Sequence, residues 1–191
     1  MNAIPAQAQE VLDFWFGHEG AVRAEWFRKD DAFDAEILRR FGALIDEAVA
    51  GGLADWQGQP ASALARIVLL DQFTRNTRRN TASAFAGDAL ALAAAQAMVS
   101  SGQDLALPPV QRTFIYLPFE HAEDRAAQDE SMRLFTALAD ADPQFRDNLD
   151  YARRHKEIIE RFGRFPHRNA ALGRESTADE IEFLKQPGSA F

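Results

Sequence analysis

Four side chains that can exchange protons fall in two segments of the sequence. Glu120, His121 and Glu123 lie within one helical turn, and His155 follows further along the chain. Crowded carboxylates raise one another's pKa, and a nearby histidine can share a proton with them. The combination predicts general acid and base chemistry. The same carboxylates could instead form a helix N-terminal turn, where the helix dipole favours negative charge without any functional role.

His155 lies on the inward stripe of an expected helix. Leu149, Ala152, Ile159 and Phe162 share its spacing of three and four residues. A lone inward histidine is more often a hydrogen-bonded core residue than a catalytic one. Both interpretations of His155 therefore stay open.

The segment from Asp71 to Asn76 is polar although it follows the apolar run "ARIVLL". On a helix, Asp71 and Arg75 are four residues apart, as are Gln72 and Asn76, so each pair can interact along one face. These four side chains are candidates for ligand binding. Alternatively, these side chains form only an ion pair and an amide pair at the end of a helix, without any ligand.

Arg164, His167, Arg168 and Asn169 lie in an expected loop after His155. Guanidinium groups bind carboxylate or phosphate through two parallel hydrogen bonds, so this loop, together with Arg75, predicts a site for a small anionic metabolite or an acidic peptide. Charge pairing is the alternative: residues 151–168 carry six basic and two acidic side chains, whereas residues 119–150 carry three basic and nine acidic ones. In that case the loop would fasten the C-terminal part of the chain without any ligand.

Several kinds of site have no counterpart in the sequence. It has no glycine-rich phosphate loop, no G-x-S-x-G nucleophile elbow and no dinucleotide fingerprint. It also lacks the H-E-x-x-H motif and the Glu-x-x-His pairs of di-iron bundles, so only ligands scattered over different helices could bind a metal. We therefore expect no metal and no cofactor.

Composition limits which classes of binding partner and which cellular compartment we expect. The 29 acidic and 21 basic side chains give a net charge of −8, which repels nucleic acid and anionic membranes. We expect no contact with either. The absence of cysteine, together with an N-terminus unlike a secretory signal, favours a cytoplasmic location. The sequence leaves the oligomeric state open.

The elements that position these residues are predicted to be helices. Apolar residues recur at helical spacing between glycine and proline punctuation, and no alternating β-branched stretch is long enough for a sheet. We expect one all-α domain over residues 1–191, with about eight helices stacked as antiparallel hairpins. Pro118 should kink or break its helix, and Thr177 and Glu180 should form a capping box. The expected ranges are 5–16, 31–50, 60–76, 81–101, 108–124, 125–140, 143–162 and a last helix from 177.

Four segments carry a resemblance to a known family. They are "VLDFWFG" (11–17), "LLDQFTRN" (69–76), "FIYLPFEHAED" (114–124) and "FGRFPHRNAALGRESTADEIEFL" (162–184). Together they resemble an uncharacterised bacterial family, the domain of unknown function 924. The resemblance implies a tetratricopeptide-like stack of helices, although the chain shows no repeat of 34 residues. It implies no established activity. Family members often have serine where this chain has Ala122, so no hydroxyl is available there.

Three hypotheses about function follow. The first is a helical binding module whose arginines hold a small anion. The second is a metal-independent hydrolase or isomerase with a Glu/His acid and base pair, in which arginines stabilise developing charge. The third is a purely structural polar core. The sequence favours binding over catalysis because no nucleophile or metal motif stands out.

Overall fold

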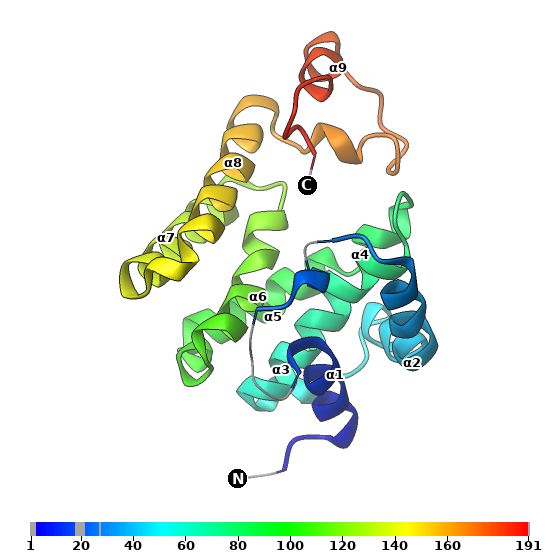
Figure 1. The fold of residues 1–191 in the computed structure, drawn as a ribbon, viewed down its shortest axis with the longest axis vertical. Coiled ribbons are helices and arrows are strands. Elements are labelled where there is room, and N and C mark those ends of the chain that lie inside the picture. Colours follow the sequence, from blue (N-terminus) through cyan, green and yellow to red (C-terminus); the bar gives the residue numbers. More distant parts are fainter. Residues whose placement is uncertain (1–2, 18–21, 27, 191) are drawn as a thin grey trace. The chain divides into compact units, whose positions relative to one another are not determined.

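The computed structural model describes residues 3–17, 22–26 and 28–190, and its regular structure there is helical, with no strand (Figure 1). Helices α3, η3 and α4 follow one another without a gap. Apart from short 3-10 turns, the described residues therefore form eight helices, as predicted. The bounds are α1 Ala6–Phe16, α2 Asp31–Val49, α3 Pro60–Ile67, η3 Val68–Phe73, α4 Thr74–Thr77, α5 Asp88–Ser101, α6 Pro109–His121, α7 Arg125–Ala141, α8 Arg146–Phe162 and α9 Ala178–Leu184. The all-α class is confirmed, whereas the tetratricopeptide-like superhelix stays a prediction.

The chain divides into two compact units. The first comprises residues 1–79 and 83–118, and the second comprises residues 80–82 and 119–191. The boundary between them falls inside α6, directly after Pro118. The expectation of a single domain over the whole chain stays a prediction.

Helix α6 is not broken at Pro118. The helix continues through this residue and ends at His121. A proline inside a helix removes one backbone donor and crowds the preceding turn, and here these costs do not end the helix. The predicted break is therefore wrong, whereas the alternative of a kink stays a prediction. The last turn of α6 carries Glu120 and His121.

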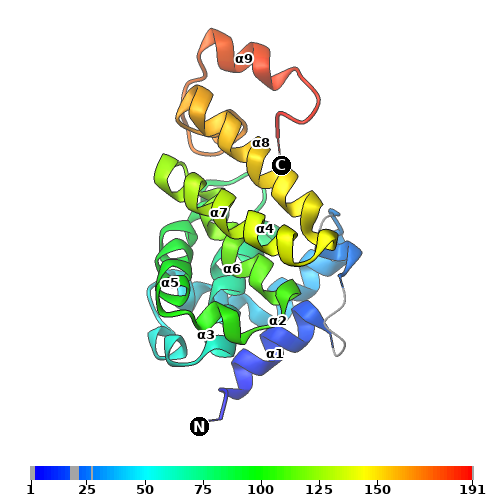
Figure 2. The same ribbon diagram turned by 90° about the vertical axis from the view of Figure 1, so that its left-hand side faces the viewer.

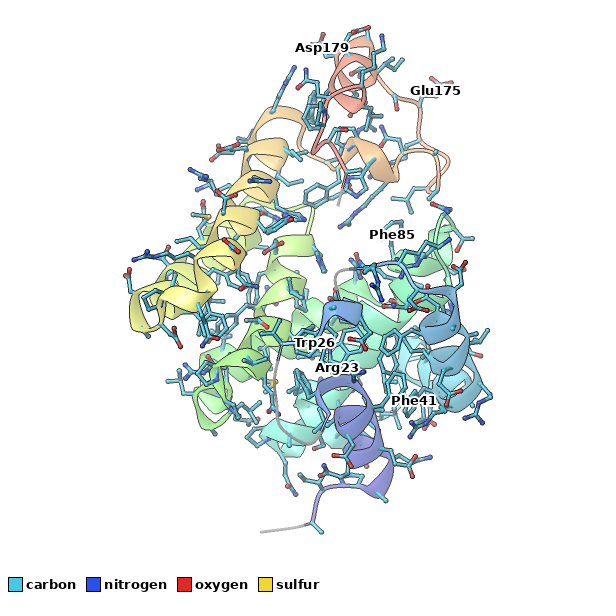
Figure 3. All side chains as sticks on the ribbon, viewed as in Figure 1. Arg23, Trp26, Phe41, Phe85, Glu175 and Asp179 are labelled. Atoms are coloured by element: carbon cyan, nitrogen blue, oxygen red, sulfur yellow. The ribbon has the colours of Figure 1, made fainter. Side chains whose placement is uncertain are left out.

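An aromatic core holds the first unit together. The buried Trp15 ring of α1 lies 5.4 Å from the ring of Phe73 and 5.6 Å from that of Phe114. Edge-to-face contacts of this kind add to the free energy of burial. Trp26, labelled in Figure 3 beside Arg23, donates its indole N–H to the Trp15 carbonyl at 2.9 Å.

A π-helical segment, η3, interrupts the α-helical pattern between α3 and α4. Thr74 Oγ1 donates to the Leu70 carbonyl at 2.8 Å, and Arg75 Nη1 donates to the Asp71 carbonyl at 2.6 Å. Segments of this type are often found at functional sites. Gly87 approaches the same segment so closely that an added Cβ would lie 2.2 Å from the Leu70 carbonyl oxygen.

One segment among the described residues, Ala82–Ser101, is long and apolar enough by length and composition to cross a membrane. Its α-helical part, α5, has 14 residues. At 1.5 Å per residue this part measures about 21 Å, which is shorter than the roughly 30 Å of a hydrocarbon core. The segment is therefore weak support for a membrane span.

In the second unit, α7 and α8 form an antiparallel hairpin (Figures 1 and 2). Phe135 of α7 and Ile159 of α8 are among its buried residues. After α8 the chain turns at Gly163 and inserts the fully buried Phe165 against Ile159. Helix α9 then begins with the predicted capping box, in which Thr177 and Glu180 bond each other's backbone amides.

Candidate functional site

The last turn of α6 is fixed by a side chain from α7. The buried Gln128 amide donates to the backbone carbonyls of Glu120 at 2.7 Å and Ala122 at 2.9 Å. Carbonyls at a helix C-terminus have no partner within the helix, so such donors stabilise the end of the helix. Gln128 therefore positions the turn that carries Glu120 and His121.

Helix α8 places His155 against this turn. His155 Nδ1 lies 3.0 Å from Glu120 Oε1 and 2.9 Å from the carbonyl oxygen of Tyr151. A carbonyl oxygen can only accept, so Nδ1 carries the hydrogen and, in the neutral ring, Nε2 carries the lone pair. The half-buried His121 lies alongside, with its ring centroid 6.1 Å from that of His155.

The surroundings keep the His155 imidazole neutral. Burial lowers its pKa to about 3, and positive charge on His121, Arg168 and His167 acts in the same direction. The Glu120 carboxylate would favour the charged ring, but burial and the cationic neighbours outweigh it. His155 is therefore a neutral base at physiological pH.

The loop after α8 packs against His155. The Phe165 ring meets the His155 ring edge to face, with 5.4 Å between centroids. The buried Arg168 guanidinium lies 4.5 Å from the centre of the Phe165 ring, and the His167 ring lies 5.7 Å from it. His155 therefore meets an apolar ring whose neighbours include the cationic Arg168.

Glu123 belongs to the attachment of this loop. Its carboxylate accepts two hydrogen bonds from Arg174, at 2.6 and 2.9 Å, and a third from the Phe165 backbone amide at 2.7 Å. These donors outweigh the effect of burial and lower the pKa of Glu123. Glu123, predicted as catalytic, thus fastens the segment that contains Phe165.

Arg164 and Asn169, predicted as ligand contacts, fasten the same loop to α9. Arg164 donates to both carboxylate oxygens of the buried Glu180, at 2.7 and 2.8 Å, and to the Glu175 carbonyl at 2.8 Å. Figure 3 labels Glu175 just before α9. Asn169 Nδ2 lies 3.3 Å from Glu180 Oε2, which also accepts the Thr177 amide. Arg164 is thus charge-paired, as in the predicted alternative, but its partner Glu180 lies outside residues 119–150, where the sequence placed the acidic partners.

The polar segment of η3 and α4 lies in the first unit. Arg75 bonds Asp71 and Asp88, at 3.0 Å each, and its guanidinium lies 5.6 Å from the ring of Phe85, labelled in Figure 3. The predicted anion-binding arginine is thus paired with two carboxylates.

The amides of this segment also have carboxylate partners. Asn76 Nδ2 donates to Asp34 of α2 at 2.6 Å, and Gln72 Nε2 donates to the neighbouring Asp71 at 2.5 Å. Arg79 bonds the same Asp34 at 2.9 Å. The contacts of Asn76 and Arg79 tie the end of α4 to α2.

Three of the predicted residues could also hold a metal ion. Glu120, His121 and His155 each offer one ligand atom, and these atoms all lie within 4.8 Å of one another. The two helices that supply them are separated by α7 in the sequence. No motif spacing could therefore indicate this group.

Gln128 is a residue of the site that sequence reasoning did not select. It lies on the buried stripe of α7 together with Ala127, Ser131, Leu134 and Phe135. A long polar side chain on an otherwise largely apolar stripe is unusual, and that position could have identified it. Its partners are backbone carbonyls, which sequence patterns do not display.

Comparison with known proteins supports the resemblance noted above. A solved structure, that of the protein of unknown function ATU0120 from Agrobacterium tumefaciens, superposes with a TM-score of 0.85 at 41% identity, covering 94% of this chain and 97% of that one. The comparison with curated proteins finds no match. Residues 11–188 match the family described as "Bacterial protein of unknown function (DUF924)". The chain therefore belongs to this bacterial family.

Proposed function

We propose that the protein is an enzyme, a hydrolase or isomerase, whose reacting centre consists of Glu120, His121 and His155. The observation that carries the proposal is the buried contact of 3.0 Å between Glu120 Oε1 and His155 Nδ1. A carboxylate in this position orients the imidazole and partly offsets the burial and the cationic neighbours that disfavour the positive charge formed when Nε2 accepts a proton. His121, beside it, can return a proton to the substrate.

A purely structural role explains the contact between Glu120 and His155 less well than it explains the contacts of Glu123 and Glu180. Glu123 and Glu180 fasten the loop after α8 through charged hydrogen bonds to Arg174 and Arg164. Gln128 of α7 already fixes the turn that carries Glu120 through the backbone carbonyls, without the contact between Glu120 and His155. Burying a carboxylate and an imidazole costs stability. A catalytic use accounts for that cost.

The substrate we propose is a small anionic metabolite. Arg168 adds positive charge beside Phe165, because its guanidinium lies 4.5 Å from the centre of that ring, and the ring in turn meets His155 edge to face. A carboxylate or phosphate group would gain from that charge. An acidic peptide end presents the same chemistry. We place the activity in the cytoplasm, as the cysteine-free composition favours.

A substrate screen tests the proposal. Purified protein is offered small carboxylate and phosphate esters, amides, lactones and chiral hydroxy acids. Any turnover is remeasured in Glu120→Gln, with Glu130→Gln, which alters a surface pair with Arg133 on α7, as the matched control. We expect Glu120→Gln to lose activity by about 10²–10⁴-fold and the control to keep it. Equal activity in both variants, with the fold intact by circular dichroism, would refute the assignment.

A further inference from the structure

We propose that Glu120, His121 and His155 bind one divalent transition-metal ion of the Zn²⁺ class. The inference rests on the proposed function in that it assigns a cofactor to the same centre, and it replaces the expectation that the centre works without metal. With the ion bound, His155 Nε2 would be a ligand and would no longer accept a proton. Its test, however, measures metal binding directly and does not need a substrate.

The distances suit a small ion. One ligand atom of each residue lies within 4.8 Å of those of the other two. With metal–ligand bonds of about 2.0–2.2 Å, tetrahedral geometry separates ligand atoms by roughly 3.3 Å. The ligand atoms must therefore move closer than 4.8 Å when the ion binds. A small rotation of His121 can achieve this, because its side chain is the least buried of the three.

The donor set selects the kind of ion. Two imidazoles and one carboxylate suit Zn²⁺ and its neighbours among the transition metals, whereas Mg²⁺ and Ca²⁺ prefer sites made of oxygen atoms. Catalytic zinc sites commonly have three protein ligands and one position for water. An ion in such a site lowers the pKa of the bound water and so supplies a nucleophile at neutral pH.

The second layer of contacts is already in place. Histidines that bind metal usually donate their other ring N–H to a carbonyl or carboxylate, which fixes the ring orientation. His155 Nδ1 has this arrangement with the Tyr151 carbonyl at 2.9 Å, so Nε2 is the atom that suits the metal. Gln128 fixes the turn with Glu120 and His121 through backbone carbonyls, and Phe165 provides an apolar side.

Cobalt binding to the purified, chelator-treated protein is the first test. Co²⁺ replaces Zn²⁺ in such sites, and its visible absorption reports imidazole ligands in low-symmetry coordination. We expect one Co²⁺ per chain with visible bands, displaced by one equivalent of Zn²⁺. Titration calorimetry with Zn²⁺ should give the same stoichiometry.

Variants assign the site. His121→Ala changes a half-buried ring, so it should fold, and it should weaken Zn²⁺ binding by about 100-fold or more, since even outer partners contribute 10–100-fold. Glu120→Gln should weaken binding similarly. Glu130→Gln changes a surface carboxylate outside the group, and it should bind as wild type does.

The outcomes separate this inference from the proposed function. Absence of saturable Co²⁺ or Zn²⁺ binding, or equal binding in Glu130→Gln and His121→Ala, would overturn the metal site. Turnover in chelator-treated protein that depends on Glu120 would then still support metal-free acid and base chemistry. Stoichiometric binding that requires His121 and Glu120 supports the metal site even if no substrate is found.

Discussion

The pair between Glu180 and Arg164 should be the main electrostatic attachment of α9. Glu180→Gln removes the negative charge but keeps a side chain that can complete the capping box. The hydrogen bond from Arg164 comes first among the causes that lower the pKa of Glu180 to about 2 from an ordinary value of 4.5, and burial acts against it. The charged carboxylate therefore stabilises the folded state.

The expected magnitude follows from that pKa. A difference of about 2.5 units, at about 1.4 kcal/mol per unit, corresponds to roughly 3 kcal/mol at pH 7. Because Arg164 is 29% exposed, solvent screening reduces the expected cost of Glu180→Gln to about 2–3 kcal/mol. The folded pKa is depressed, so this contribution is full above about pH 4.5 and falls as the pH drops towards 2. At pH 3 less than half of it should remain.

Urea unfolding at pH 7 and pH 3, followed by circular dichroism and by hydrogen exchange of α9 amides, measures this change. Trp15, Trp26 and Trp56, the tryptophans of the chain, lie in the first unit, so tryptophan fluorescence does not report directly on α9. The control is Glu182→Gln on the same helix, whose pair with Lys185 is exposed and should contribute less than about 1 kcal/mol. Equal costs for both variants, or a cost for Glu180→Gln that does not change with pH, would refute the reasoning.

Two further substitutions test close packing and the support of the candidate site. Gly87→Ala should destabilise the first unit by about 1–3 kcal/mol in thermal unfolding, because its Cβ would meet the Leu70 carbonyl; Gly58→Ala, with open space around it, should differ by less than about 0.5 kcal/mol. Gln128→Met should lower the free energy of unfolding in urea by about 1–3 kcal/mol, since it leaves the Glu120 carbonyl without its donor, and a wild-type value would contradict this.

Local patterns account for what the sequence predicts well. The capping box of Thr177 and Glu180 depends on residues three apart, and the structure confirms it. Helix ranges likewise follow from spacing within a few turns. The exception is Pro118, where propensity predicts a break and the continuing helix tolerates the proline.

Contacts between distant segments could not be predicted in the same way. The sequence identifies Glu120 and His155 as candidate residues. No local pattern, however, shows that the chain returns after α7 and brings their side chains to 3.0 Å from each other. The partners of the arginines depend on the same kind of information: Arg164 could bind a ligand or a carboxylate, and only the path of the loop shows that Glu180 is there. Whether the loop binds a ligand or is fastened by charge pairing therefore depends on the path of the chain, which local sequence patterns do not show.

The loop that carries Phe165 has one further consequence. Glu123 holds it near its beginning through the Phe165 amide, and Glu180 holds it through Arg164 and Asn169. The backbone there loses its conformational entropy when the protein folds, before any ligand arrives. A molecule bound at Glu120, His121 and His155 therefore does not have to order the loop that packs against His155, and more of its contact energy can appear as affinity.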